Sequence, residues 1–383
     1  MLAAAVLTGE VFEQLRLPSV AGQLLSGILL GPTVLGVVST NDQVQAISSI
    51  SLFFIIFLIG FQMSTDTVKQ HIRHGLLLTG SSFLLPMLAV FSLTILLLPF
   101  GAASDLVIAL AIAVPSISII SVLVTQYKLL EKESGRIILS TVAITDIVAF
   151  VLLVAVSTPV FNTISVIAYT AILVAAFAAV DVVLNRQPKA FRRTVEKTGR
   201  LLRGEDTPYA VLILVGLFMA AIFQAIGLSY IIGAFFAGLI VHDGLIGRKP
   251  FQEVSMTFAR MNRAFFIPLF FGLAGLESDL QASSYSLLPR LGLIAAATLL
   301  LSILLTYYAA KRILKVKEQG GARRIAVTLG GRGAVGIVIA SVALSSGAID
   351  AVAYSLIVLA TLIISLVVPI LLGRKASSDL QPD

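Results

Sequence analysis

The segment Arg136–Ser157, RIILSTVAITDIVAFVLLVAVS, decides how the rest of the chain is interpreted. At the helical rise of about 1.5 Å per residue it is long enough to cross a lipid bilayer. Apart from Arg136 at its edge it carries a single charge, Asp146, near its middle. A bare carboxylate at that depth costs about 2.5–3.5 kcal/mol to insert. A cost of this size favours a functional role for Asp146.

The composition predicts an all-α polytopic membrane protein. Of the 383 residues, 58% are hydrophobic and 12% are charged, whereas soluble domains carry about 25% charged residues. The mean hydropathy is +1.02. The chain has no cysteine and three histidines, which excludes disulfides, thiol nucleophiles and cysteine-ligated metals and disfavours a histidine metal centre. We expect no cofactor and no enzyme, because no nucleophile–base pair or metal-ligand set occurs at usable spacing.

Apolar runs predict about thirteen membrane spans. They lie near residues 1–16, 18–38, 46–64, 75–99, 105–126, 136–157, 162–184, 207–226, 228–245, 256–276, 285–310, 323–347 and 350–373. Alternate connecting loops hold most of the 27 basic residues, and the opposite loops hold none. The positive-inside rule therefore predicts a protein of the cytoplasmic (inner) membrane with a cytoplasmic C-terminus. This topology, and not nucleic-acid binding, explains the net charge of +7.

An internal repeat is visible in the sequence. Residues 17–31, LPSVAGQLLSGILLG, align with residues 228–242, LSYIIGAFFAGLIVH, and this places Gly27 on Gly238 at an offset of 211 residues. The two copies begin at predicted spans that are an odd number apart, so they face opposite ways across the membrane. Such inverted-topology repeats are typical of secondary transporters. The glycines themselves favour close helix packing over substrate contact.

Two predicted spans at corresponding positions of the repeats are interrupted. In span 105–126 a proline removes a backbone donor and serines follow it; these residues are Pro115, Ser116 and Ser118. In span 323–347 glycines flank a basic residue; the central ones are Gly331, Arg332 and Gly333. Matched breaks of this kind are the best sequence indication of an ion site near the bilayer midplane. We expect Arg332 to compensate charge at such a break.

Asp146 can bind a proton or a monovalent cation, but not both well, because each neutralises the same carboxylate. This competition produces exchange, and if the carrier reorients readily only when Asp146 is neutralised, H⁺ and Na⁺ or K⁺ cross in opposite directions, one for one. The hydroxyls of Thr145, Ser116 and Ser118 offer the neutral oxygens that a hard cation needs. Two alternatives stay open: Asp146 pairs with Arg332 as a structural ion pair, or the hydroxyls only bond back to their own helices.

The chain resembles the cation/proton antiporter superfamily, that is, the bacterial sodium/proton and potassium/proton exchangers, over essentially its whole length. The order and spacing of several motifs carry this resemblance. They are LPSVAGQLLSGILLGPTVLG (17–36), IGFQMSTD (59–66), RIILSTVAITDIVAF (136–150), GLSYIIGAFFAGLIV (227–241), FFGLAGLESDL (270–280) and GGRGAVGIVIA (330–340).

The resemblance implies a homodimer in which a moving core slides against a scaffold by an elevator mechanism, with two crossed broken helices in the core. The ion-binding aspartate of the family corresponds to Asp146. The implied segments are scaffold or dimerisation helices in 1–64 and 207–276, core helices in 75–157 and 285–373, a linker helix with a basic loop in 158–206, and a cytoplasmic tail in 374–383.

The chain also departs from the family pattern. The residue before the aspartate is Thr145, where the family usually has an acidic or amide residue. Electrogenic members carry a lysine in a span that here, in residues 291–310, has no charge; Ser302 or Ile303 stands about where it would be. These departures predict electroneutral 1:1 exchange. The competing functions are a non-exchanging sensor or subunit in which Asp146 is locked to Arg332, and a carrier of an organic solute.

Overall fold

The computed structural model describes most of the chain: residues 1–62, 72–116, 132–157, 207–225, 230–240, 248–278, 286–316 and 320–376, except Arg16, Thr33 and Thr40, together with Ile120, Val124 and Leu129. Within these residues the secondary structure is helical, without a β-sheet, as predicted. The predicted span 162–184, the basic loop and Ser118 lie outside them.

The helices agree with the predicted spans to within a few residues at most ends. Their bounds are α1 Leu2–Gln14, α2 Ser19–Leu30, α3 Asp42–Gln62, α5 Ile72–Thr79, α6 Leu85–Leu97, α7 Ala102–Ala113, α9 Glu133–Ser157, α12 Thr207–Ala225, α13 Tyr230–Ile240, α15 Arg248–Met261, α16 Ile267–Leu276, α18 Leu288–Tyr308, α19 Gly321–Thr328, α20 Ala334–Ser345 and α21 Ala351–Ala376. Three π-helical turns link some of them: η1 Gly80–Leu84, η2 Asn262–Phe266 and η3 Ala309–Ile313.

Several helices have the length and composition of membrane spans. Within the described residues, five are long and apolar enough to cross a membrane: Asp42–Phe61, Arg73–Leu97, Glu133–Leu153, Leu288–Ile313 and Ala351–Val368. Shorter apolar helices accompany them, among them Ala102–Ala113 and Ala334–Ser345, each of which is one half of a broken span. The total of thirteen spans remains a prediction.

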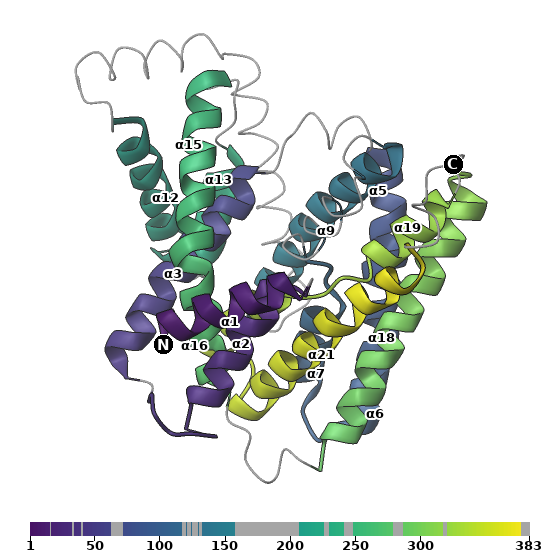
Figure 1. Cartoon of the computed structure of the whole chain (residues 1–383), viewed down its shortest axis with the longest axis horizontal. Coiled ribbons are helices and arrows are strands. Elements are labelled where there is room, and N and C mark those ends of the chain that lie inside the picture. Colours follow the sequence, from purple (N-terminus) through teal and green to yellow (C-terminus); the bar gives the residue numbers. More distant parts are fainter. Residues whose placement is uncertain are drawn as a thin grey trace. The chain divides into compact units, whose positions relative to one another are not determined.

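The described residues form two compact units. One comprises those within 1–41, 66–153 and 271–383, and the other those within 42–65 and 154–270. In the first unit α7 packs against α6 and α20, and α18 packs against α6 and α19 (Figure 1). In the second unit α13 packs against α3 and α12, and α15 contacts α3 (Figure 1).

The repeat glycines make counterpart packing contacts. A Cβ atom at Gly27 of α2 would collide with the backbone carbonyl oxygen of Gly272 in α16. A Cβ atom at Gly238 of α13 would collide in the same way with the carbonyl oxygen of Phe57 in α3. Both glycines therefore allow two helix backbones to touch, and the prediction of close packing is confirmed.

Two helices are broken at the predicted positions. The residue before a proline is disfavoured in the α region, and Val114 is extended at φ −70° and ψ 125°, so α7 ends at Ala113. A short extended stretch likewise separates α19 from α20. Pro115 and Arg332 form an isolated antiparallel bridge, and the Ser116 N–H donates to the Gly331 carbonyl oxygen at 2.9 Å. The predicted crossing of two broken helices is confirmed.

The π-helical turns were not predicted. Two of them end two residues before a proline, η1 before Pro86 and η2 before Pro268. A proline ring clashes with the carbonyl of the residue four positions earlier, and a wider turn relieves this clash.

One helix start was predicted wrongly. The run from α15 through η2 to α16 begins at Arg248, whereas the sequence placed a loop there and a span from residue 256. The early turns are amphipathic, and their apolar side packs on aromatic residues of α3: the Phe251 and Phe61 ring centroids lie 4.6 Å apart. This tertiary contact explains why the polar beginning is helical.

Candidate ion-binding site

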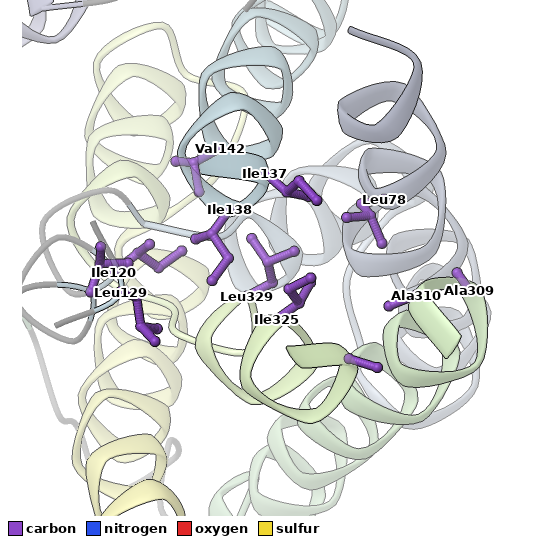
Figure 2. Packing of buried hydrophobic residues seen from close by; sticks show 12 residues of the cluster. Leu78, Ile120, Leu129, Ile137, Ile138, Val142, Ala309, Ala310, Ile325 and Leu329 are labelled. Carbon is purple, nitrogen blue, oxygen red and sulfur yellow. The ribbon is translucent and has the colours of Figure 1, made fainter. Parts of the chain in front are cut away.

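An apolar cluster supports the helix that carries Asp146. Figure 2 shows Ile138 and Val142 of α9 packed with Ile325 of α19 and with Leu329, which directly follows α19. All four side chains are fully buried. The cluster thus holds α9 beside α19, the helix that ends at the break around Arg332.

Asp146 follows on the same face of α9 as Ile138 and Val142, since residues four apart in a helix are neighbours on one face. Its side chain has no exposed surface. Neither carboxylate oxygen has a hydrogen-bond partner among the residues that the structure describes. A buried carboxylate with both oxygens free is expensive unless it binds a proton or a cation.

The Thr145 hydroxyl lies next to this carboxylate in sequence but already has partners. It donates to the Thr141 carbonyl oxygen at 2.8 Å, one turn earlier on α9. It is also 3.0 Å from the hydroxyl of Thr79, at the end of α5. The alternative that this hydroxyl bonds back to its own helix is therefore confirmed, although its oxygen keeps lone pairs for a cation. Sequence analysis missed Thr79, which has no local signal beyond being a hydroxyl in an apolar run.

Arg332 lies at the crossing and is 1% exposed. Its Nη1 donates to the Leu329 carbonyl oxygen at 2.6 Å, at the C-terminal end of α19. Its Nη2 donates to the Ser82 carbonyl oxygen at 2.9 Å and to the Ser302 hydroxyl at 2.7 Å. No carboxylate pairs with it in the described part of the chain, so the Asp146–Arg332 ion pair left open above is not formed.

The remaining predicted residues lie at the crossing. Pro115, Ser116 and Gly331 meet there through the bridge and the Ser116–Gly331 hydrogen bond. Ser116 is fully buried. Gly333 is extended and immediately precedes α20. No hydrogen bond joins Asp146 to any of these residues, and Ser118 lies outside the described residues.

A second buried carboxylate was missed by the sequence analysis. Asp105 is 1% exposed, and its Oδ1 has no hydrogen-bond partner among the described residues. It lies in the first turn of α7, where the helix dipole stabilises a negative charge. The sequence analysis used Asp105 only to mark the start of a span.

Comparison with known proteins decides the family. The sequence profile described as "Sodium/hydrogen exchanger, transmembrane" matches residues 1–374. The chain belongs to the sodium/hydrogen exchanger family. As predicted, it is therefore a member of the antiporter superfamily and a multi-pass membrane protein.

Known relatives of this exchanger family member are distant in sequence, and some of them are similar to it in length. A Na⁺/H⁺ antiporter of Enterococcus hirae is 25% identical over 378 residues, covering 97% of this chain and 95% of its own. The K⁺/H⁺ antiporter 1 of Saccharomyces cerevisiae is 25% identical over 303 residues, covering 70% of this chain and 33% of its own. The sodium proton antiporter MjNhaP1 of Methanocaldococcus jannaschii, solved at pH 8, has a TM-score of 0.75 at 16% identity, covering 99% of this chain and 95% of its own. These matches show an exchanger fold.

Among the described residues, no three His, Asp or Glu side chains lie close enough together to hold a metal ion. A single carboxylate with neighbouring neutral oxygens suits a monovalent cation that binds and leaves.

Proposed function

We propose that the protein exchanges a monovalent cation, Na⁺ or K⁺, for H⁺ across the cytoplasmic membrane, one for one and without net charge movement. The shared proton and cation site is Asp146. The observation that carries this proposal is the complete burial of Asp146 with both oxygens unpaired in the described chain.

The exchange follows from the cost of burying a charge. An ionised Asp146 is unfavourable in a low-dielectric interior, so the site is stable only when a proton or a cation neutralises it. If the core reorients only in the neutralised state, each cation that moves one way is matched by one proton that moves the other way. Thr145 and Ser116 are the proposed neutral cation ligands, with Ser118 as a further candidate.

The arrangement of Arg332 supports exchange over a locked sensor. The sensor alternative requires the guanidinium to neutralise Asp146 permanently. In the structure the guanidinium donates to neutral oxygens of Leu329, Ser82 and Ser302 instead. Asp146 is thereby left for exchangeable ions.

Several larger features belong to the same proposal. The counterpart contacts of Gly27 and Gly238 support an inverted repeat. Elevator motion of the core segments 75–157 and 285–373 against the scaffold segments 1–64 and 207–276, a homodimer embedded in lipid, and a cytoplasmic C-terminus rest on family membership and on the distribution of basic residues.

The first experiment is proton flux in liposomes that contain the purified protein. Lumenal pH is followed while Na⁺, K⁺ or Li⁺ is added outside, with the membrane potential clamped at zero. We expect one or more cations to drive proton efflux in the parent, and the active cation identifies the substrate. Asp146→Asn should abolish this flux, because the neutral amide takes up no proton and has no negative charge for a cation to neutralise.

The matched control is Asp105→Asn, which changes the other buried carboxylate of the described chain in the same way. It should retain cation-driven flux. Equal loss in both variants would refute a single-carboxylate site. A silent parent across a broad pH range would refute the exchange itself and turn attention to the sensor or to a carrier of an organic solute.

A further inference from the structure

The strongest polar feature that the exchange mechanism leaves unexplained is the set of groups that hold Arg332. The Nη2 atom donates to both the Ser302 hydroxyl and the Ser82 carbonyl oxygen, at 2.7 and 2.9 Å. The Ser302 hydroxyl in turn donates to the same Ser82 carbonyl oxygen at 3.0 Å. The three groups form a closed triangle, which we call the arginine receptor.

The Ser82 carbonyl is available because of a proline. In an α-helix this carbonyl would accept from the N–H of the residue four positions later, which is Pro86 and has no N–H. The π-helical turn η1 widens the helix at the same place. A main-chain acceptor is thereby freed inside a buried helix, and π-helical turns commonly mark functional positions.

The receptor and the end of α19 together hold the guanidinium. Nη1 donates to the Leu329 carbonyl, which follows the last residue of α19, where carbonyls lack intrahelical partners. Hydrogen bonds from a charged donor are shorter and stronger than neutral ones. The guanidinium therefore stays charged and fixed, with neutral oxygens as its only hydrogen-bond partners in the described chain.

We infer that Ser302 and the Ser82 carbonyl position Arg332 so that its charge caps the broken helix and does not compete with the cation for Asp146. Ser302 is a positioning residue that acts through Arg332. This inference rests on the proposed exchange function and adds to it a determinant of cation affinity. Without the receptor, the flexible side chain is released in a low-dielectric interior, where an unpaired buried carboxylate such as Asp146 attracts it.

The test compares two buried hydroxyls on α18. Ser302→Ala removes the receptor hydroxyl. Thr298→Val removes a hydroxyl one turn away that, among the described residues, donates only to the Ile294 carbonyl of its own helix. We expect Ser302→Ala to raise the cation KM about three- to tenfold with little change in Vmax, in the range of coupled contacts. Ser302→Thr, which keeps the hydroxyl, should restore the parent KM, and Thr298→Val should leave it unchanged.

A double-mutant cycle tests whether Ser302 acts through Arg332. In an Arg332→Gln background, Ser302→Ala should have no further effect on KM. A KM increase of the same size in that background overturns the inference, as does a Vmax loss shared equally by Ser302→Ala and Thr298→Val.

If Arg332→Gln does not fold, Pro86→Ala replaces it. The N–H that this change restores competes for the Ser82 carbonyl and should raise the cation KM. Pro268→Ala, which makes the same change after η2, should leave the KM unchanged.

Failure of the exchange proposal can be told apart from failure of this inference. If the parent transports no cation, the same cycle is measured by thermal unfolding of the purified variants. Non-additive shifts of the melting temperature for Ser302→Ala and Arg332→Gln would support the receptor contact. Additive shifts would overturn it, whatever the protein transports.

Discussion

At the scale of single residues, the buried ionisable groups of Arg332 and Asp146 differ in their surroundings. Arg332 has three hydrogen bonds to neutral oxygens, and Asp146 has none among the described residues. Buried charges usually pair with each other when both are present. In the proposed mechanism, this lack of pairing leaves the Asp146 carboxylate to be neutralised by ions from solution.

Thr145 should contribute one neutral oxygen to the cation. Thr145→Val removes the hydroxyl at nearly constant volume, and the loss of one ligand to a charged group is worth about 1.5 kcal/mol or more. We expect the cation KM to rise about tenfold, with proton binding at Asp146 retained. KM is measured from cation-driven proton flux in liposomes.

The control for this change is Thr141→Val, because within the described part of the chain the Thr141 hydroxyl donates only to the Ile137 carbonyl of its own helix. Thr145→Ser should behave like the parent. An unchanged KM in Thr145→Val would remove Thr145 from the proposed ligand set.

At the scale of helices, the sequence predicted the breaks because their causes are local. Pro115 restricts its neighbour and removes its own N–H, and the glycines around Arg332 favour an interruption. The partners of Arg332 could not be predicted in this way. Ser302 lies 30 residues away and Ser82 lies 250 residues away, so only the fold brings them together. The π-helical turns have a local signal in a following proline, but proline alone does not decide between a kink, a widened turn and a helix end.

The close helix packing at Gly27 and Gly238 should be disrupted by any side chain at these two positions. Gly27→Ala puts a Cβ against backbone atoms of α16, which cannot move aside as a side chain can. We expect a loss of about 1–3 kcal/mol of stability, seen as a lower melting temperature of the purified protein. Gly238→Ala should have a similar effect, because its contact with α3 is the counterpart.

Gly292→Ala on α18 is the control for this packing prediction, since nothing lies within 4 Å of the added Cβ. It should leave stability unchanged or raise it by up to about 1 kcal/mol through helix propensity. If Gly27→Ala and Gly292→Ala behave alike, the close approach of α2 and α16 does not matter for stability.

At the scale of the whole molecule, more of the fold than of the candidate site could be predicted from the sequence. The apolar runs, the glycine repeat and the matched breaks together predicted a helical membrane fold of the secondary-transporter type, because each follows from membrane thickness or backbone sterics. The site depends on which oxygens converge around one carboxylate. Thr79, Ser82 and Asp105 were missed because an isolated hydroxyl, a main-chain carbonyl or a terminal carboxylate has no pattern in the sequence.

The stoichiometry is a property of the whole transport cycle, and one carboxylate predicts that it is 1:1. In liposomes with a tenfold cation gradient, net proton flux should then stop at an opposing pH difference of about one unit. This pH difference at zero net flux should be the same at every clamped potential, because no net charge crosses.

With two protons per cation, net flux at zero potential would stop at a pH difference of about half a unit. It would also shift with voltage, since each net charge gains about 2.3 kcal/mol per 100 mV. A voltage-dependent balance that becomes voltage-independent in Asp105→Asn would identify Asp105 as a second proton carrier and contradict the single-carboxylate mechanism.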